Sequence, residues 1–108
     1  MQPSEILKEL YDLTKTSSKG VEALYEAEQK LAEAEHALDT MEARAFLDAD
    51  GTVADRQALS RLEAADIRLE RDLAKAQVNR IKTKMRTIDS AMMAHATMSK
   101  LMQAEMKL

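Results

Sequence analysis

The chain has 108 residues, with 16 Lys and Arg against 19 Asp and Glu, a net charge of −3, and no cysteine. Two glycines and one proline interrupt residue types that otherwise favour helix. This composition excludes a disulfide framework, a cysteine nucleophile and a cysteine-based zinc site, and it argues against an α/β enzyme fold. We therefore expect a single all-α domain over residues 1–108, in a reducing compartment.

The first helix is predicted over residues 4–47. Ser4 can cap the first free amides, and Glu5 suits the positive end of the helix dipole. Apolar residues from Leu24 to Ala45 recur at alternating spacings of three and four, which is typical of a coiled-coil seam. The segment 14–20 (TKTSSKG) has low helix propensity and marks the place for a kink, but we expect the helix to continue.

A turn is predicted over residues 48–52. Gly51 can adopt the left-handed conformation after a helix end, and Thr52 with Asp55 fits a capping box. One long helix should follow over residues 53–106, which contain neither glycine nor proline. Its predicted apolar stripe runs through Leu59, Leu62, Leu69, Leu73, Ala74, Val78, Ile81, Met85, Ile88, Met92 and His95. The step from Leu73 to Ala74 predicts that the stripe drifts around the helix.

Two such helices predict a long antiparallel helical hairpin, a coiled coil. A hairpin with so few large side chains buries too little apolar area to offset the conformational entropy that it loses on folding. We therefore expect the chain to form a homo-oligomer that completes the fold. Six of the eight methionines lie between residues 85 and 108. The predicted subunit contacts are Met85, Met92, Met98, Leu101 and Met102. Packing of this tail against Ile6, Leu7, Leu10 and Leu13 is the alternative that the sequence leaves open.

Charge is unevenly distributed along the chain. Residues 1–51 carry five basic and twelve acidic side chains, whereas residues 52–108 carry eleven and seven. The candidate nucleic-acid-binding residues are Arg68, Arg71, Lys75, Arg80, Lys82, Lys84 and Arg86. Helical spacing places most of them on one strip that could follow a phosphate backbone. The alternative is that the second helix pairs with acids of the first, from Glu22 to Glu33, and so sets the hairpin register.

No aromatic side chain lies in the basic stretch, so any contact with nucleic acid should be electrostatic, sensitive to salt and indifferent to sequence. The segment from Asp48 through Asp50 to Thr52 matches the nucleophile motif of haloacid-dehalogenase-type phosphatases. That motif works at the end of a parallel strand, which this sequence does not predict. His36 and His95 are single histidines on different predicted helices. We predict no enzyme, no metal site and no cofactor.

No segment is long and uncharged enough to span a bilayer, and the N-terminus lacks the pattern of a secretory signal. We expect a cytoplasmic protein without a membrane partner.

The segments YEAEQKLAEAEHALDTMEARAFLDADGTVADRQA and RTIDSAMMAHATMSKLMQAEMKL, with a glycine turn and a basic second helix, resemble small helical proteins of tailed phages, especially those of actinobacterial hosts. More distantly, the chain is similar to UvsY-type recombination mediators, which form rings and help load recombinase onto single-stranded DNA. The resemblance implies an oligomeric accessory protein of DNA recombination or replication in a bacterial host. It implies that Lys75 and the basic residues 80–86 contact phosphates, and that the methionine-rich tail joins subunits.

Two other functions remain open from the sequence. One is a coiled-coil adaptor, or a phage inhibitor, that binds a recombinase or a host complex through an exposed apolar face. The other is an assembly protein of the virion.

Overall fold

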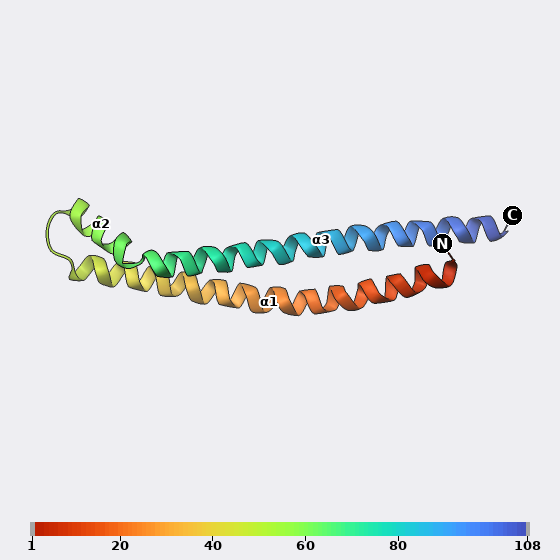
Figure 1. Cartoon of the computed structure of the whole chain (residues 1–108), viewed down its shortest axis with the longest axis horizontal. Helices are drawn as coiled ribbons and strands as arrows, with labels where there is room; N and C mark the ends of the chain where they lie inside the picture. The colour runs from red at the N-terminus through yellow and green to blue at the C-terminus, as the bar shows by residue number, and fades with distance from the viewer. Residues whose placement is uncertain (1, 108) are drawn as a thin grey trace. The chain divides into compact units, whose positions relative to one another are not determined.

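The structure is a computed structural model that describes residues 2–107. Within that range it contains three α-helices and no strand: α1 (Pro3–Asp48), α2 (Val53–Glu63) and α3 (Ala65–Lys107). α1 packs against α3, which runs in the opposite direction, so the predicted all-α hairpin is confirmed (Figure 1). Contacts group into two compact units. Unit 1 comprises residues 1–24 and 80–108, and unit 2 comprises residues 25–79.

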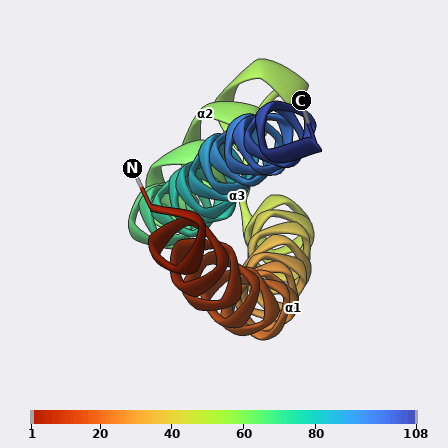
Figure 2. The ribbon, with the colours of Figure 1, turned by 90° about the vertical axis from the view of Figure 1, so that its right-hand side faces the viewer.

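α1 continues through residues 14–20 without a break, as expected. The hydroxyl groups of Thr14 and Thr16 donate to the carbonyl oxygens of Leu10 and Asp12, at 2.8 and 3.0 Å. The polar side chains of this segment are therefore bonded back to the helix itself, one turn earlier. Within unit 1 the first turns of α1 lie beside the last turns of α3 (Figure 2).

The predicted turn and cap are also confirmed. Gly51 has a φ of 107°, a conformation that favours glycine. The Asp55 amide donates to the Thr52 hydroxyl at 3.2 Å, and the Thr52 amide donates to the Asp55 carboxylate at 3.3 Å. This reciprocal pair satisfies free amides at the start of α2.

The prediction of one continuous helix after the turn is wrong, because α2 ends at Glu63 and α3 begins at Ala65. Ala64 lies between them with φ −88° and ψ 4°. Just beyond the break, the Arg68 guanidinium donates to the Arg61 carbonyl at 3.2 Å and so takes up a backbone acceptor at the end of α2. α2 is inclined to the start of α3 (Figure 1).

The residues at which the helices contact each other form a seam, and along each helix they recur at alternating spacings of three and four. In α1 the buried and half-buried positions of this seam are Ile6, Leu10, Leu13, Ser17, Gly20 and Leu24 in unit 1, and Ala27, Leu31, Ala34, Leu38, Met41 and Ala45 in unit 2. In α2 and α3 they are Ser60, Ala64, Ile67, Arg71, Ala74 and Val78 in unit 2, and Ile81, Met85, Ile88, Met92, His95, Ser99 and Met102 in unit 1. The seam predicted from Leu24 to Ala45, and that from Ala74 to His95, are confirmed.

The first part of the stripe predicted for the second helix is wrong. Leu59, Leu62, Leu69 and Leu73 are 43% to 72% exposed. The seam does not drift at Ala74, because the same spacing runs back from Val78 to Ser60. Small side chains at Ser60 and Ala64 face α1 there, and the four leucines are left on the opposite side.

Candidate functional site

The basic segment of α3 in unit 1 presents four charged side chains to solvent. Arg80, Lys82, Lys84 and Arg86 are all exposed. Within residues 2–107, the ion pairs closer than 4.0 Å involve other cations, namely Arg68, Arg71 and His95. The alternative prediction, in which this segment pairs with acids of the first helix, is therefore not realised.

The four cations of this segment lie on two sides of the helix. Lys82 and Arg86 are one turn apart, and Arg80 and Lys84 are one turn apart on the other flank of the seam. Six residues of helix rise by about 9 Å, a length that matches only a few phosphates of one strand. A single chain therefore offers a small number of phosphate contacts.

The candidates in unit 2 are placed differently. Arg68 is half-buried, with its Nη2 atom 2.6 Å from a carboxylate oxygen of Glu42, and Arg71 is a half-buried member of the seam whose Nε atom lies 2.7 Å from Asp72. The Arg68 contact joins α3 to α1, whereas the Arg71 contact is with the next residue of α3; each guanidinium group therefore has a carboxylate partner. Lys75 is exposed and is the one predicted contact residue of unit 2 that remains open to solvent in the described chain.

The predicted subunit-contact residues also divide into two groups. Met85, Met92 and Met102 are half-buried at the seam of unit 1. A Cβ atom at Gly20 would lie 3.2 Å from Met85 Cγ, so Met85 packs in the space that a side chain at position 20 would approach. Met98 and Leu101 are exposed. Packing against α1 therefore applies to three of the five residues, and the other two face outward.

His95 makes two hydrogen bonds in unit 1. Its Nδ1 atom lies 2.7 Å from the Ala91 carbonyl, and its Nε2 atom bonds to the Glu9 carboxylate. Both partners are acceptors, so both ring nitrogens can donate only when the imidazole is protonated. The hydrogen bonds to Ala91 and Glu9 raise the pKa of His95 above 6.5. The sequence predicted His95 on the stripe but gave no signal for Glu9, which is 86 positions away.

Unit 1 has a hollow of about 260 Å³ over the Gly20–Met85 contact. Its walls include Ala23, Ile81 and Ile88, and Lys19 and Lys84 also line it. On the α1 side the hollow is lined in part by the small residues Gly20 and Ala23.

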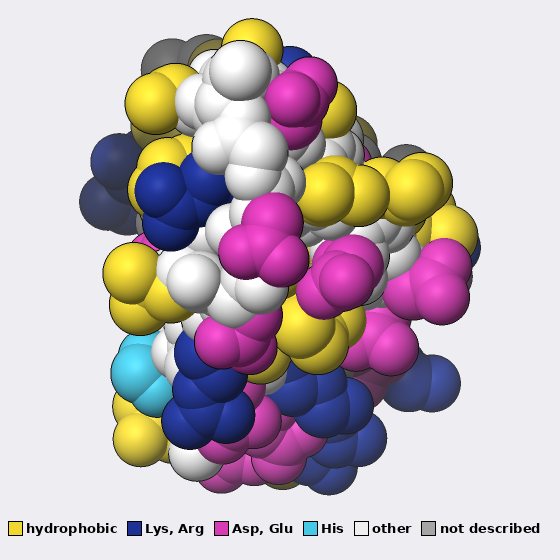
Figure 3. Space-filling view, turned by 90° about the vertical axis from the view of Figure 1, so that its left-hand side faces the viewer, with side chains coloured by type: hydrophobic (Ala, Val, Ile, Leu, Met, Phe, Trp, Pro, Cys, Tyr) yellow, Lys and Arg dark blue, Asp and Glu magenta, His cyan; other side chains and the backbone are white. Residues whose placement is uncertain are grey.

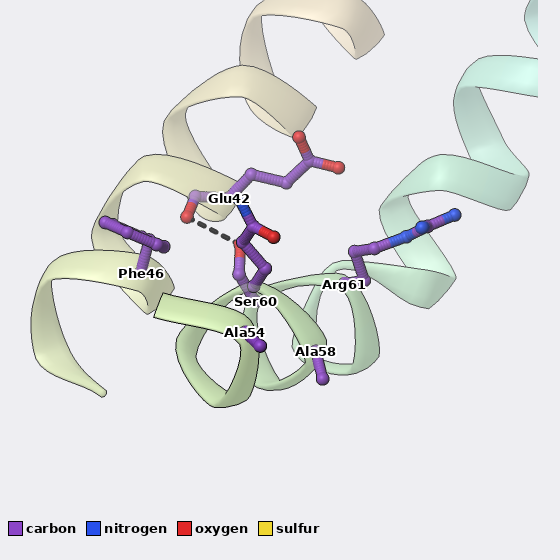
Figure 4. A pocket seen from close by; sticks show the side chains of 7 residues that line it. Glu42, Phe46, Ala54, Ala58, Ser60 and Arg61 are labelled. Atoms are coloured by element: carbon purple, nitrogen blue, oxygen red, sulfur yellow. Dashed lines mark hydrogen bonds between the residues drawn. The ribbon is translucent and has the colours of Figure 1, made fainter. Parts of the chain in front are cut away.

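Unit 2 has a hollow between the end of α1 and α2 (Figure 4). The Ser60 hydroxyl donates to the Glu42 carbonyl at 2.8 Å along one side of it. Next to it, the Arg56 guanidinium lies over the Phe46 ring at 4.3 Å and donates from Nε to the Phe46 carbonyl at 3.0 Å. Because the Glu42 carboxylate is bonded to Arg68, it is not placed as a free base in this hollow.

The structure gives no constellation for metal chemistry in the part that it describes. Among residues 2–107, no group of three or more His, Cys, Asp and Glu side chains is placed to hold a metal ion. Asp48 ends α1 and Asp50 lies in the turn, both exposed. No described helix has an apolar stretch of the length that a bilayer crossing needs.

Comparisons with models of protein families, with curated proteins and with solved structures found no match. The resemblance to phage proteins and recombination mediators therefore stays a prediction.

One surface was missed at the sequence level, namely the four leucines on the outer side of α2 and α3. A usable signal was present. Extending the alternating spacing backwards from Val78 gives Ala74, Arg71 and Ile67, which leaves each leucine outside the seam. The predicted stripe runs through the leucines instead, because they too recur at helical spacing.

Proposed function

We propose that the protein is an oligomeric accessory protein of phage-type DNA recombination or replication that binds single-stranded DNA through the basic segment Arg80–Arg86. The observation that carries this proposal is the exposure of four cations on one short stretch of α3, with no carboxylate within ion-pair distance in the described residues. Unpaired surface cations bind phosphates with little competition from the protein's own acids.

Binding of this kind has a definite physical signature. Lysine and arginine displace counterions from the phosphate backbone, so affinity falls steeply with salt. For a single strand that contacts the two cations of one flank, Lys82 and Arg86, the slope of log K against log salt should be roughly −1.4 per chain. No aromatic residue of the segment is available for base stacking, so affinity should depend little on base sequence.

Association of several chains would give these few contacts useful strength. Once one basic segment of an oligomer is bound, the next segment binds the same strand at a high effective concentration. The overall affinity of the oligomer is therefore much higher than that of one chain. A recombinase is a fitting partner for such an assembly, and the bacterial cytoplasm is its expected location.

The experiment is a titration of a fluorescent single-stranded oligonucleotide, followed by anisotropy at low and moderate salt. The Lys82→Glu/Arg86→Glu variant should bind at least about tenfold more weakly than the wild type. Its matched control is Lys8→Glu/Lys15→Glu, which changes the net charge of unit 1 equally at exposed positions of α1 outside the segment and outside the predicted subunit contacts. Equal loss in both variants, or binding by neither the wild type nor the control, would refute the assignment.

The second candidate function is an adaptor that binds another protein, as an inhibitor of a host complex or in virion assembly. It is favoured by the exposed Met93, Met98, Leu101 and Met106 at the end of α3. A purified partner that binds the wild type and not the Met98→Asp/Leu101→Asp variant would support it. Retained binding by that variant would count against it.

A further inference from the structure

The hollow of unit 1 at the contact between Gly20 and Met85, here called the Gly20 hollow, has mostly apolar walls. On α1 it is lined by Gly20 and Ala23, and on α3 by Ile81, Met85 and Ile88. Its volume of about 260 Å³ is slightly smaller than the range of about 300–1,000 Å³ that is typical of pockets for drug-sized ligands. The α3 wall from Ile81 to Ile88 is about 10 Å long at 1.5 Å per residue. An aliphatic wall of this length fits a single alkyl chain.

Two lysines, one from each helix, line the same hollow. Lys19 of α1 and Lys84 of α3 are both exposed, and within residues 2–107 neither has a carboxylate oxygen closer than 4.0 Å. The other polar residue of the lining, Thr16, donates its hydroxyl hydrogen to the Asp12 carbonyl at 3.0 Å. Two ammonium groups at one hollow repel each other, and an anion beside both relieves that repulsion.

The charge around the Gly20 hollow stays positive when the neighbouring acids are counted. Within four positions of Lys19 or Lys84 the chain carries six cations and one acid, Glu22. Glu22 is exposed and does not line the hollow. The next acids along the chain lie five to seven positions from the nearer lysine and are also outside the lining: Asp12, Glu26 and Asp89. The hollow therefore combines apolar walls with a positive rim.

Other hollows of the described chain have a different lining. Three of them each include a glutamate, namely Glu42, Glu105 and Glu26. Figure 3 views the end of the molecule that carries the turn, where acidic side chains lie among the hydrophobic ones. A carboxylate that lines a hollow repels an anionic ligand. The Gly20 hollow differs from these three in having lysines and no acid in its lining.

We propose that the Gly20 hollow binds a single-chain anionic amphiphile, namely a fatty carboxylate. The alkyl chain lies along the aliphatic wall of α3, and the carboxylate accepts charge-assisted hydrogen bonds from Lys19 and Lys84. The inference is independent of DNA binding, because Lys82 and Arg86 lie on the other flank of the seam and do not line the hollow.

The test is an NMR titration of the full chain with decanoate, at low salt and below the concentration at which decanoate forms micelles. The methyl signals of Ile81, Met85 and Ile88 should shift and saturate. Each methylene group removed from the probe, as in octanoate and hexanoate, should weaken binding by up to about fourfold. Decyltrimethylammonium has the same chain with a positive head group and should not shift these signals.

The head-group contact is tested by Lys19→Gln/Lys84→Gln, which should weaken decanoate binding at least about tenfold. Its matched control, Lys82→Gln/Arg86→Gln, removes the same charge from the other flank of α3 and should keep an affinity within about threefold of the wild type. All four positions are exposed, so both variants should keep the wild-type helix content, which circular dichroism checks.

The hollow itself is tested by Ala23→Leu, which places a large side chain in it and should also weaken binding at least about tenfold. The matched control is Ala94→Leu, which adds the same side chain at an exposed alanine of unit 1 outside the hollow. Absence of saturable methyl shifts with decanoate would overturn the proposal. Equal binding of the cationic probe, or equal losses in the variants and their controls, would do the same.

Discussion

The Nη2 atom of Arg68 lies 2.6 Å from a carboxylate oxygen of Glu42, and this contact joins the two helices of unit 2 beside the break at Ala64. The Glu42 carbonyl also accepts a hydrogen bond from Ser60, which precedes the break. Glu42 therefore binds both α2 and α3. A single residue of α1 thus contacts the returning chain on both sides of the break.

We predict that Glu42→Gln and Arg68→Met each lower the free energy of unfolding by about 0.5–1.5 kcal/mol, because the pair is only partly shielded from water. The double variant should lose less than the sum of the single losses, since the two side chains act on each other. Urea unfolding of the four proteins measures this coupling. Additive losses would show that the contact contributes nothing of its own.

The seam register predicts opposite results for two apolar residues of α3. Ile88 is 8% exposed and Leu73 is 62% exposed. Ile88→Ala should lower stability by about 2–4 kcal/mol through lost burial and a cavity. Leu73→Ala should change it by less than about 0.5 kcal/mol. The comparison is made by urea unfolding at protein concentrations low enough to keep the chains apart, and losses of similar size would contradict the register.

The two glycines should respond oppositely to alanine. At Gly51 the φ of 107° and a Cβ position only 3.0 Å from the Asp55 carboxylate make Gly51→Ala destabilising by about 1 kcal/mol or more. At Gly20 the near neighbour is the flexible Met85 side chain, so Gly20→Ala should gain up to about 1 kcal/mol of helix propensity. Thermal unfolding of both variants gives the signs. If Gly20→Ala lowers the stability, the Met85 side chain cannot move enough to make room for the added methyl group.

Stability should depend on pH through His95, whose side chain is 19% exposed and whose pKa is raised above 6.5 by its bonds to Ala91 and Glu9. A group with a raised folded pKa contributes its full stabilisation below the unfolded value, and this is lost as pH rises through the folded value. The stability advantage of the wild type over His95→Gln should therefore be largest near pH 6, about 0.5 units below the unfolded pKa, and shrink towards pH 8, about 1.5 units above it. Urea unfolding at both pH values measures it.

Titration of His95 by NMR gives an independent check on the same contact. The Glu9→Gln variant should have a lower His95 midpoint than the wild type, because it removes the acceptor charge. A wild-type midpoint at or below 6.5 would contradict the hydrogen bonds described for the ring.

Local signals predicted much of the fold. The capping box at Thr52, the glycine at position 51 and the seam from Leu24 to Ala45 each depend on residues close together in the sequence. No glycine or proline near Ala64 predicts the break there. The residues on either side of the break contact Glu42, which is 22 positions before Ala64. The stripe predicted near Arg71 was wrong because Leu59, Leu62, Leu69 and Leu73 also recur at helical spacing and so form a second apolar stripe.

The candidate site was predicted to a similar extent. Helical spacing was enough to place Lys82 and Arg86 on the surface beside the seam. It was not enough to show that Arg68 lies against Glu42, because that contact requires the register between two helices. The exposure of Leu59, Leu62, Leu69 and Leu73 depends on the same register.

The capped turn at Thr52 has a consequence for how the hairpin forms. Contacts near it close short loops: Phe46 and Arg56 are 10 positions apart and Glu42 and Ser60 are 18 apart, whereas Glu9 and His95 are 86 apart. Short loops cost the least closure entropy, so pairing should start at the turn and advance residue by residue to the termini, like a zipper. Unit 1 would then be the last part to fold and the first to open. Backbone amides near Glu9 should exchange with solvent sooner than those near Glu42.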